Sequence, residues 1–119
     1  MALPLQSSYI MRCTCKTTHE FESIETVSVL DSIKPYDEIW VLQCSRCEAL
    51  WLRVFFDTSQ YSKSRQWFDA LLAQKSELNG LMIEESIEEV FLNAPLSFQG
   101  GGWLGGKVLP FKGLPKPLI

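Results

Sequence analysis

The four cysteines of this chain occur as two short pairs, and this spacing constrains the fold more than any other feature of the sequence. One residue separates Cys13 from Cys15, and two residues separate Cys44 from Cys47. Two such pairs, each presented by a tight turn, can complete a tetrahedron of thiolates around a soft cation such as Zn²⁺. We therefore expect one closed zinc site, with each pair of cysteines at the tip of a hairpin.

Other uses of these side chains remain open but fit the sequence less well. A disulfide between Cys13 and Cys15 would be strained, and cross-pairing would require an oxidising compartment. A redox role for the second pair would require a helix that begins at Cys44, but the residues after Cys47 have the pattern of a strand. His19 could replace a sulfur; because four thiolates already fill the coordination sphere, we expect it at the surface or behind a ligand.

The segments that flank the cysteines have the composition of β-strands. Four stretches rich in Val, Ile, Phe and Trp are separated by polar or turn-prone residues, and they cover Tyr9–Cys13, Phe21–Leu30, Ile39–Gln43 and Leu50–Phe56. We expect them to form a small, mostly antiparallel sheet over residues 9–57. Apolar residues occupy both faces of the third stretch, which predicts a strand that is covered on both sides.

Residues 62–93 have the spacing of two helices that cover the sheet. Ser62 or Ser64 can cap the first helix, which would end at Asn79-Gly80 and bury a broad stripe made of Trp67, Phe68, Leu71, Leu72 and Leu78. The second helix would end near Pro95 and bury Ile83, Ile87, Val90 and Phe91. Its other face carries four acidic residues, Glu84, Glu85, Glu88 and Glu89.

Residues 94–119 hold most of the glycines and prolines and cannot form a long helix. A phosphate-binding loop is excluded because Val108, and not Ser or Thr, follows Gly106-Lys107. The apolar residues of this segment predict that it packs on the body, with an edge strand near Lys107–Leu109 and with Trp103 and Phe111 largely buried. The three regions together predict one α+β domain over residues 1–119.

The residues around the cysteines resemble the zinc-ribbon group of domains over roughly residues 9–56. The resemblance lies in Cys13-Thr-Cys15 and in Trp40-Val-Leu-Gln-Cys44-Ser-Arg-Cys47-Glu-Ala-Leu-Trp51. It implies hairpins of the zinc-ribbon kind and a structural role for the four cysteines. The chain departs from the pattern after each pair, where Lys16 and Glu48 replace the usual glycine and leave the geometry of the two turns open.

The net charge of −3, from 14 acidic and 11 basic side chains, has the wrong sign for a protein that binds the phosphate backbone of nucleic acids. All of the acidic residues lie before residue 90, whereas Lys107, Lys112 and Lys116 form a basic C-terminal segment. The acidic part suits a basic protein partner, and it equally suits an ordinary solvated surface. The N-terminal residues lack the pattern of a secretory signal, which predicts a cytoplasmic location.

No catalytic constellation is evident in the sequence. Four thiolate ligands would close the metal's coordination sphere, whereas catalytic zinc keeps one position for water. The chain has one histidine and none of the common motifs of serine hydrolases or zinc proteases. We therefore expect a protein that is not an enzyme. A small-ligand protein or a metal-dependent enzyme would need a pocket beneath the glycine-rich C-terminal segment.

These expectations favour a non-catalytic, zinc-stabilised module that binds another protein. By type, such a small acidic domain is similar to the immunity proteins of bacterial toxin loci. That similarity implies a basic toxin domain as the partner, recognised by Glu84, Glu85, Glu88 and Glu89 with Trp103 and Phe111 as apolar anchors. The alternative is a zinc-ribbon nucleic-acid or transcription factor that uses Arg46 at the turn, with Arg12, Lys16 and Arg53 nearby.

Overall fold

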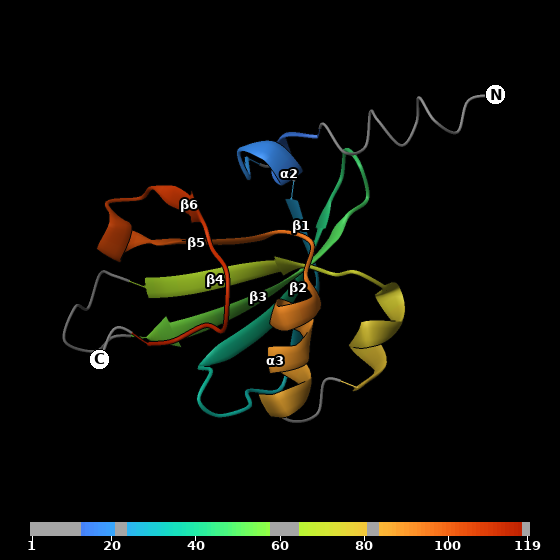
Figure 1. Ribbon diagram of the computed structural model, residues 1–119, viewed down its shortest axis with the longest axis vertical. Helices are drawn as coiled ribbons and strands as arrows, with labels where there is room; N and C mark the ends of the chain where they lie inside the picture. Colours follow the sequence, from blue (N-terminus) through green and yellow to red (C-terminus); the bar gives the residue numbers. More distant parts are fainter. Residues whose placement is uncertain (1–12, 21–23, 58–64, 81–83, 118–119) are drawn as a thin grey trace.

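The computed structural model describes residues 13–20, 24–57, 65–80 and 84–117, which form a six-stranded antiparallel sheet with helices at one end and on one face (Figure 1). The strands follow the chain order across the sheet, as β1 (Ile24–Leu30), β2 (Glu38–Cys44), β3 (Leu50–Asp57), β4 (Arg65–Leu71), β5 (Ser97–Gly101) and β6 (Val108–Pro110). The helical elements are α2 (Thr14–Thr17), α3 (Glu84–Asn93) and the 3₁₀ turns η2 (Lys75–Gly80) and η3 (Gly102–Leu104). The α+β fold class predicted from the sequence is confirmed.

The sheet buries side chains on both of its faces. In β2, Ile39 and Val41 point to one face and Leu42 and Cys44 to the other, as the apolar run in the sequence predicted. The first of these faces, here called the α3 face, packs against α3 and the C-terminal segment. The opposite face, here called the metal face, carries the cysteine cluster at one end of the sheet.

The helix predicted before Pro95 is confirmed as α3. Its apolar stripe, formed by Ile87, Val90 and Phe91, is buried on the sheet, while Ile83 lies outside the described residues. The described helices are all too short or too polar to cross a bilayer.

The first predicted helix is wrong, because Arg65–Leu71 form the central strand β4. Its burial runs continuously from Phe68 to Leu71, since Phe68 and Ala70 face α3 while Asp69 and Leu71 face the metal side. A strand that is covered on both faces loses the alternation of apolar and polar residues by which strands are recognised. Leu78 lies in η2 and packs against the α3-face core.

The described part of the C-terminal segment packs against the sheet, as its apolar content predicted. It adds β6 at the sheet edge, close to the predicted position, and then crosses the α3 face (Figure 1). Phe111 is partly buried against Phe68, with the ring centroids 4.7 Å apart, which is less burial than predicted. The Gln66 side-chain amide donates a 2.9 Å hydrogen bond to the carbonyl oxygen of Lys116. The side chain of Trp103 lies outside the described residues.

Candidate metal centre

The second cysteine pair lies in the turn between β2 and β3, as predicted. Cys44 ends β2, and its backbone is closed into a tight turn by two hydrogen bonds. The Glu48 N–H donates to the Cys44 carbonyl oxygen at 2.8 Å, and the Cys44 N–H donates to the Ala49 carbonyl oxygen at 3.0 Å. Glu48 adopts a φ of 64°, the left-handed conformation that usually selects glycine after the second cysteine. The turn therefore keeps this geometry without glycine.

The first pair lies in a helical turn and not at a hairpin tip, so that part of the prediction is wrong. Cys13 precedes α2, and the Lys16 N–H donates to the Cys13 carbonyl oxygen at 2.8 Å. One helical turn closes the backbone after Cys13, and the sequence pattern did not distinguish it from a hairpin turn. Of the predicted strand Tyr9–Cys13, only Cys13 lies within the described residues.

The four sulfur atoms form a compact cluster between these two turns. All of them lie within 4.8 Å of one another, with 3.8 Å between the Sγ atoms of Cys13 and Cys44 and 3.4 Å between those of Cys15 and Cys47. A tetrahedron with Zn–S bonds of about 2.3 Å has edges of about 3.8 Å. Three of the cysteines are buried, and Cys47 is partly exposed. The donor set and its spacing therefore fit a metal ion.

The surroundings of the cluster shift the pKa values of its thiols in different directions. Burial raises the pKa of the Cys15 thiol, and hydrogen bonding among the neighbouring thiols raises it further. Burial acts on Cys44 in the same direction. Backbone hydrogen bonds from Cys47 and Arg46, together with hydrogen bonds to the thiols of Cys15 and Cys13, outweigh it and lower the pKa of the Cys44 thiol. A coordinating metal removes the proton from a thiol outright, so the cation would compensate for the burial of Cys15.

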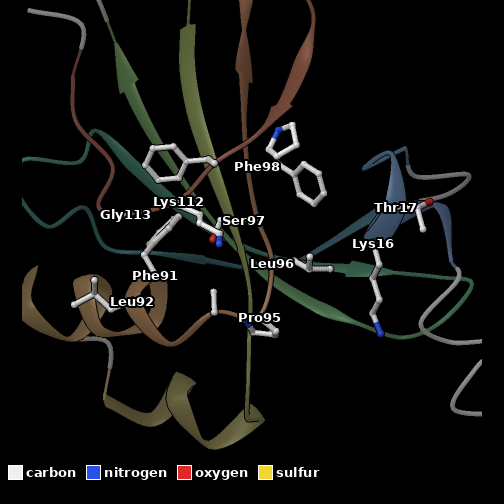
Figure 2. A pocket seen from close by; sticks show the side chains of 13 residues that line it. Lys16, Thr17, Phe91, Leu92, Pro95, Leu96, Ser97, Phe98, Lys112 and Gly113 are labelled. Atoms are coloured by element: carbon white, nitrogen blue, oxygen red, sulfur yellow. The ribbon is translucent and has the colours of Figure 1, made fainter.

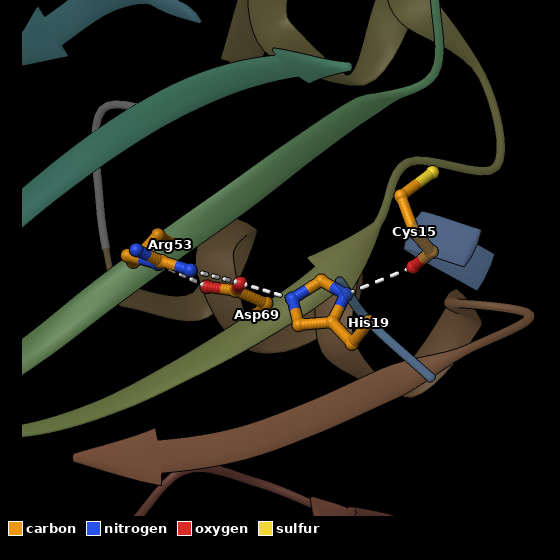
Figure 3. Close-up of polar contacts among 4 residues, drawn as sticks. All are labelled: Cys15, His19, Arg53 and Asp69. Atoms are coloured by element: carbon orange, nitrogen blue, oxygen red, sulfur yellow. Dashed lines mark hydrogen bonds and ion pairs between the residues drawn. The ribbon is translucent and has the colours of Figure 1, made fainter. Parts of the chain in front are cut away.

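His19 lies directly behind the first cysteine pair and is buried, with 4% of its surface exposed. Its Nδ1 is 2.9 Å from the carbonyl oxygen of Cys15, and its Nε2 is 2.5 Å from a carboxylate oxygen of Asp69 (Figure 3). The ring stacks on Phe98, with centroids 4.3 Å apart and an interplanar angle of 8°. His19 thus occupies the position behind a ligand that the sequence prediction allowed, and it links α2 to the sheet.

Asp69 extends this contact into a buried ionic network on the metal face. Its side chain is fully buried and accepts two hydrogen bonds from Arg53, at 2.6 Å from Nε and 2.7 Å from Nη2 (Figure 3). The Arg53 guanidinium lies over the Trp67 ring at 4.2 Å. Gly100 lies directly against the Trp67 indole, and a Cβ at position 100 would overlap that ring. A chain of contacts therefore runs from Cys15 across three strands.

Asp69 was not singled out from the sequence, and Arg53 was considered only as a nucleic-acid contact. Each is a lone charged residue inside a strongly apolar segment, Trp67-Phe68-Asp69-Ala70-Leu71 and Leu50-Trp51-Leu52-Arg53-Val54. Charged side chains are rarely buried unless they are paired, so two opposite charges in such segments are a signal for a buried ion pair. Their contact follows from the register that places Arg53 opposite Asp69.

The other predicted binding residues are not gathered at the metal centre. Glu84, Glu85 and Glu89 are exposed on α3 and Glu88 is partly buried there, while Phe111 lies in the C-terminal segment on the same side of the sheet. Of the residues proposed for nucleic-acid binding, Arg46 is exposed in the cysteine turn, Lys16 is partly buried on α2, and Arg53 contacts Asp69. Arg12 lies outside the described residues.

Comparisons of the chain with protein-family models, with curated proteins and with solved structures found no match. The geometry of the cysteine cluster and its surroundings therefore carries the functional argument.

Proposed function

We propose that this protein is a non-catalytic binding module whose fold is held together by one structural Zn²⁺ at Cys13, Cys15, Cys44 and Cys47. The observation that carries the proposal is the cluster of four sulfur atoms within 4.8 Å of one another. A site made only of thiolates suits Zn²⁺ among the common cellular cations, because Mg²⁺ and Ca²⁺ prefer oxygen ligands.

The position of the cluster supports a structural role for the metal. It joins α2 to the β2–β3 turn, two segments that are distant in the sequence. The four-residue α2 is too short to persist as an isolated helix in water, so it depends on contacts with the rest of the fold. The metal would supply these contacts together with His19, and its binding energy would be part of the folding energy.

The donor set also favours binding over catalysis. Four protein thiolates leave no coordination position for water or substrate, and they donate enough electron density to make the metal a weak Lewis acid. The nearby histidine, which could act as a base in another setting, has both ring nitrogens in contact with Cys15 and Asp69. These features support a site that holds the fold and does no chemistry of its own.

The metal content of the purified protein tests the proposal. We expect about one zinc per chain, and replacement by Co²⁺ should give the absorption bands of tetrahedral thiolate coordination. Cys44→Ser should lose the metal and lower the stability by several kcal/mol. His19→Ala should retain one zinc, because the ring contacts the backbone of Cys15 and not the metal position.

Two outcomes would contradict this assignment. A metal-free protein with four free thiols and an unchanged melting temperature would exclude the structural site. Loss of zinc in the His19→Ala variant at a temperature where the variant remains folded would show that the ligand set is wrong. The toxin-immunity and nucleic-acid interpretations both stay predictions.

A further inference from the structure

A groove lies beside the metal centre, below the C-terminal segment, where a small-ligand function would need a pocket. Its volume is about 540 Å³, within the range of about 300–1,000 Å³ that is typical of small-molecule sites. Four separate segments border it: α2, the end of α3 with the turn that follows, the start of β5, and residues 110–113 (Figure 2). Segments that are far apart in the sequence therefore build this concave site.

The lining of the groove is largely apolar. Phe91 and Phe98, which are both buried, contribute to its walls, and Leu96, just before β5, lies below Phe98 in this view (Figure 2). Leu92 stands at the groove with 64% of its surface exposed. An apolar molecule in this groove would cover the exposed side chain of Leu92 and the partly exposed side chain of Leu96, and that burial favours binding.

Two lysines give the groove a positive charge. Lys16 extends from α2 on one side, and Lys112 lies toward α3 on the other (Figure 2). No acidic side chain is among the residues that line the groove. Within the described part of the chain, neither lysine forms an ion pair. The protein as a whole has a net charge of −3, so the groove is a local exception to its surroundings.

We propose that this groove binds a small apolar molecule that carries one carboxylate, of the size of a medium-chain fatty acid. The apolar body covers Leu96 and the exposed Leu92, and the carboxylate pairs with the ammonium group of Lys112 at one side of the groove. A carboxylate, and not a neutral or cationic head, is favoured because two ammonium groups border the groove and no acidic side chain of the described residues lines it.

The proposal goes beyond the structural metal site and depends on it only for the position of α2. Lys16 follows Cys15 directly, so the metal ligands fix one wall of the groove. Phe98 connects the two sites from the other side, since it lines the groove and stacks on His19. We therefore expect chelation of the metal to abolish binding in the groove, whereas loss of groove binding should leave the metal in place.

Titration of the ¹⁵N-labelled, zinc-loaded protein with octanoate tests the proposal. The expected result is a saturable change in amide chemical shifts confined to α2, residues 91–98 and residues 110–113. Octanol and octyltrimethylammonium, used below the concentrations at which they form micelles, serve as neutral and cationic probes of the same chain length. We expect each of them to bind about tenfold more weakly than octanoate.

Single substitutions separate the carboxylate contact from general apolar binding. Lys112→Gln should weaken octanoate binding about five- to tenfold and leave octanol binding unchanged. Lys75→Gln is the matched control, because Lys75 is exposed in η2 and does not line the groove. Leu92→Glu should weaken octanoate binding more than Leu92→Gln does, and both variants should fold because Leu92 is exposed. The zinc content should remain one per chain in every variant.

The proposal is wrong if octanoate gives no saturable shifts, if octanol or the cation binds as well as octanoate, or if Lys112→Gln and Lys75→Gln behave alike. It is also wrong if the groove resonances depend on protein concentration while octanoate has no effect, because a second copy of the chain then occupies the groove. A preparation without metal would count against the proposed zinc site instead, and its zinc analysis would identify that failure separately.

Discussion

The two faces of the sheet are stabilised by different means. On the α3 face, Ile39, Leu52, Val54 and Ile87 belong to a continuous core of aliphatic and aromatic side chains. On the metal face, cysteines make up much of the buried cluster. A buried ionic network of His19, Asp69 and Arg53 lies beside that cluster.

This difference shows which face of the sheet depends on specific partner groups for its stability. The α3 face is held by apolar burial, which requires only water as the solvent. The metal face holds a short helix and several buried polar groups, and each of these is stable only when its partner is present. A cation at the sulfur cluster, together with the carboxylate of Asp69, would therefore stabilise this face as apolar packing stabilises the other.

Removal of the metal should produce the largest difference in stability between the two faces. When a chelator extracts the metal, we expect amide protection in α2 and the β2–β3 turn to fall by several kcal/mol, because metal binding energy is local folding energy there. Protection in the centre of β3, in β4 and in α3 should fall much less. Hydrogen exchange followed by mass spectrometry or NMR measures both. Equal loss on both faces would mean that the sheet does not fold without metal.

Loss of the buried carboxylate should have the next largest effect. Asp69→Asn leaves the guanidinium of Arg53, whose side chain is 17% exposed, without its counter-charge. We expect a loss of about 3 kcal/mol in the free energy of unfolding, measured by urea denaturation. Glu89→Gln, at an exposed position of α3, is the control and should change the stability by less than about 0.5 kcal/mol.

A double-mutant cycle would sharpen this result. Arg53→Met in the Asp69→Asn background should cost much less than Arg53→Met alone, because the contact between the two side chains is already lost. Additive effects of the two substitutions would show that the ion pair contributes nothing to the metal face.

The smallest expected effect is a gain in stability at the cysteine turn. Glu48 has a φ of 64°, a conformation that costs a residue with a side chain about 1–2 kcal/mol, whereas glycine adopts it freely. Glu48→Gly should therefore raise the stability by up to about 1 kcal/mol after the greater flexibility of unfolded glycine is subtracted. Arg46→Gly in the same turn should lower it, because Arg46 does not have a positive φ. Thermal unfolding of the zinc-loaded variants measures both.

The features that could be predicted from the sequence depend on local spacing. Close cysteine pairs identified all four members of the sulfur cluster, and the 3.6-residue period of Ile87, Val90 and Phe91 identified α3. The second cysteine turn was also predicted, because Cys44 and Cys47 lie between two apolar runs that pair as neighbouring strands.

The features that could not be predicted depend on which strands pair. Once Trp67–Leu72 were assigned to a helix, Asp69 had no register with Arg53, and the ion pair could not be seen. His19, which lies just after α2, is 50 positions from Asp69 in the sequence, and the residues around each of them do not indicate this contact. Long-range partners of this kind follow from the order of strands in the sheet. When both faces of a sheet are buried, its strands have a uniform apolar pattern that does not indicate which strands are neighbours.

The close approach of Gly100 to Trp67 has a consequence for how this sequence can diverge. Any side chain at position 100 displaces the indole, and the indole in turn supports the guanidinium of Arg53. We therefore expect the two positions to change together in evolution, although neither belongs to the sulfur cluster. A descendant of this chain that gains a larger residue at position 100 should also have exchanged Trp67 for a smaller one, and its buried charges will have been rearranged or lost with it.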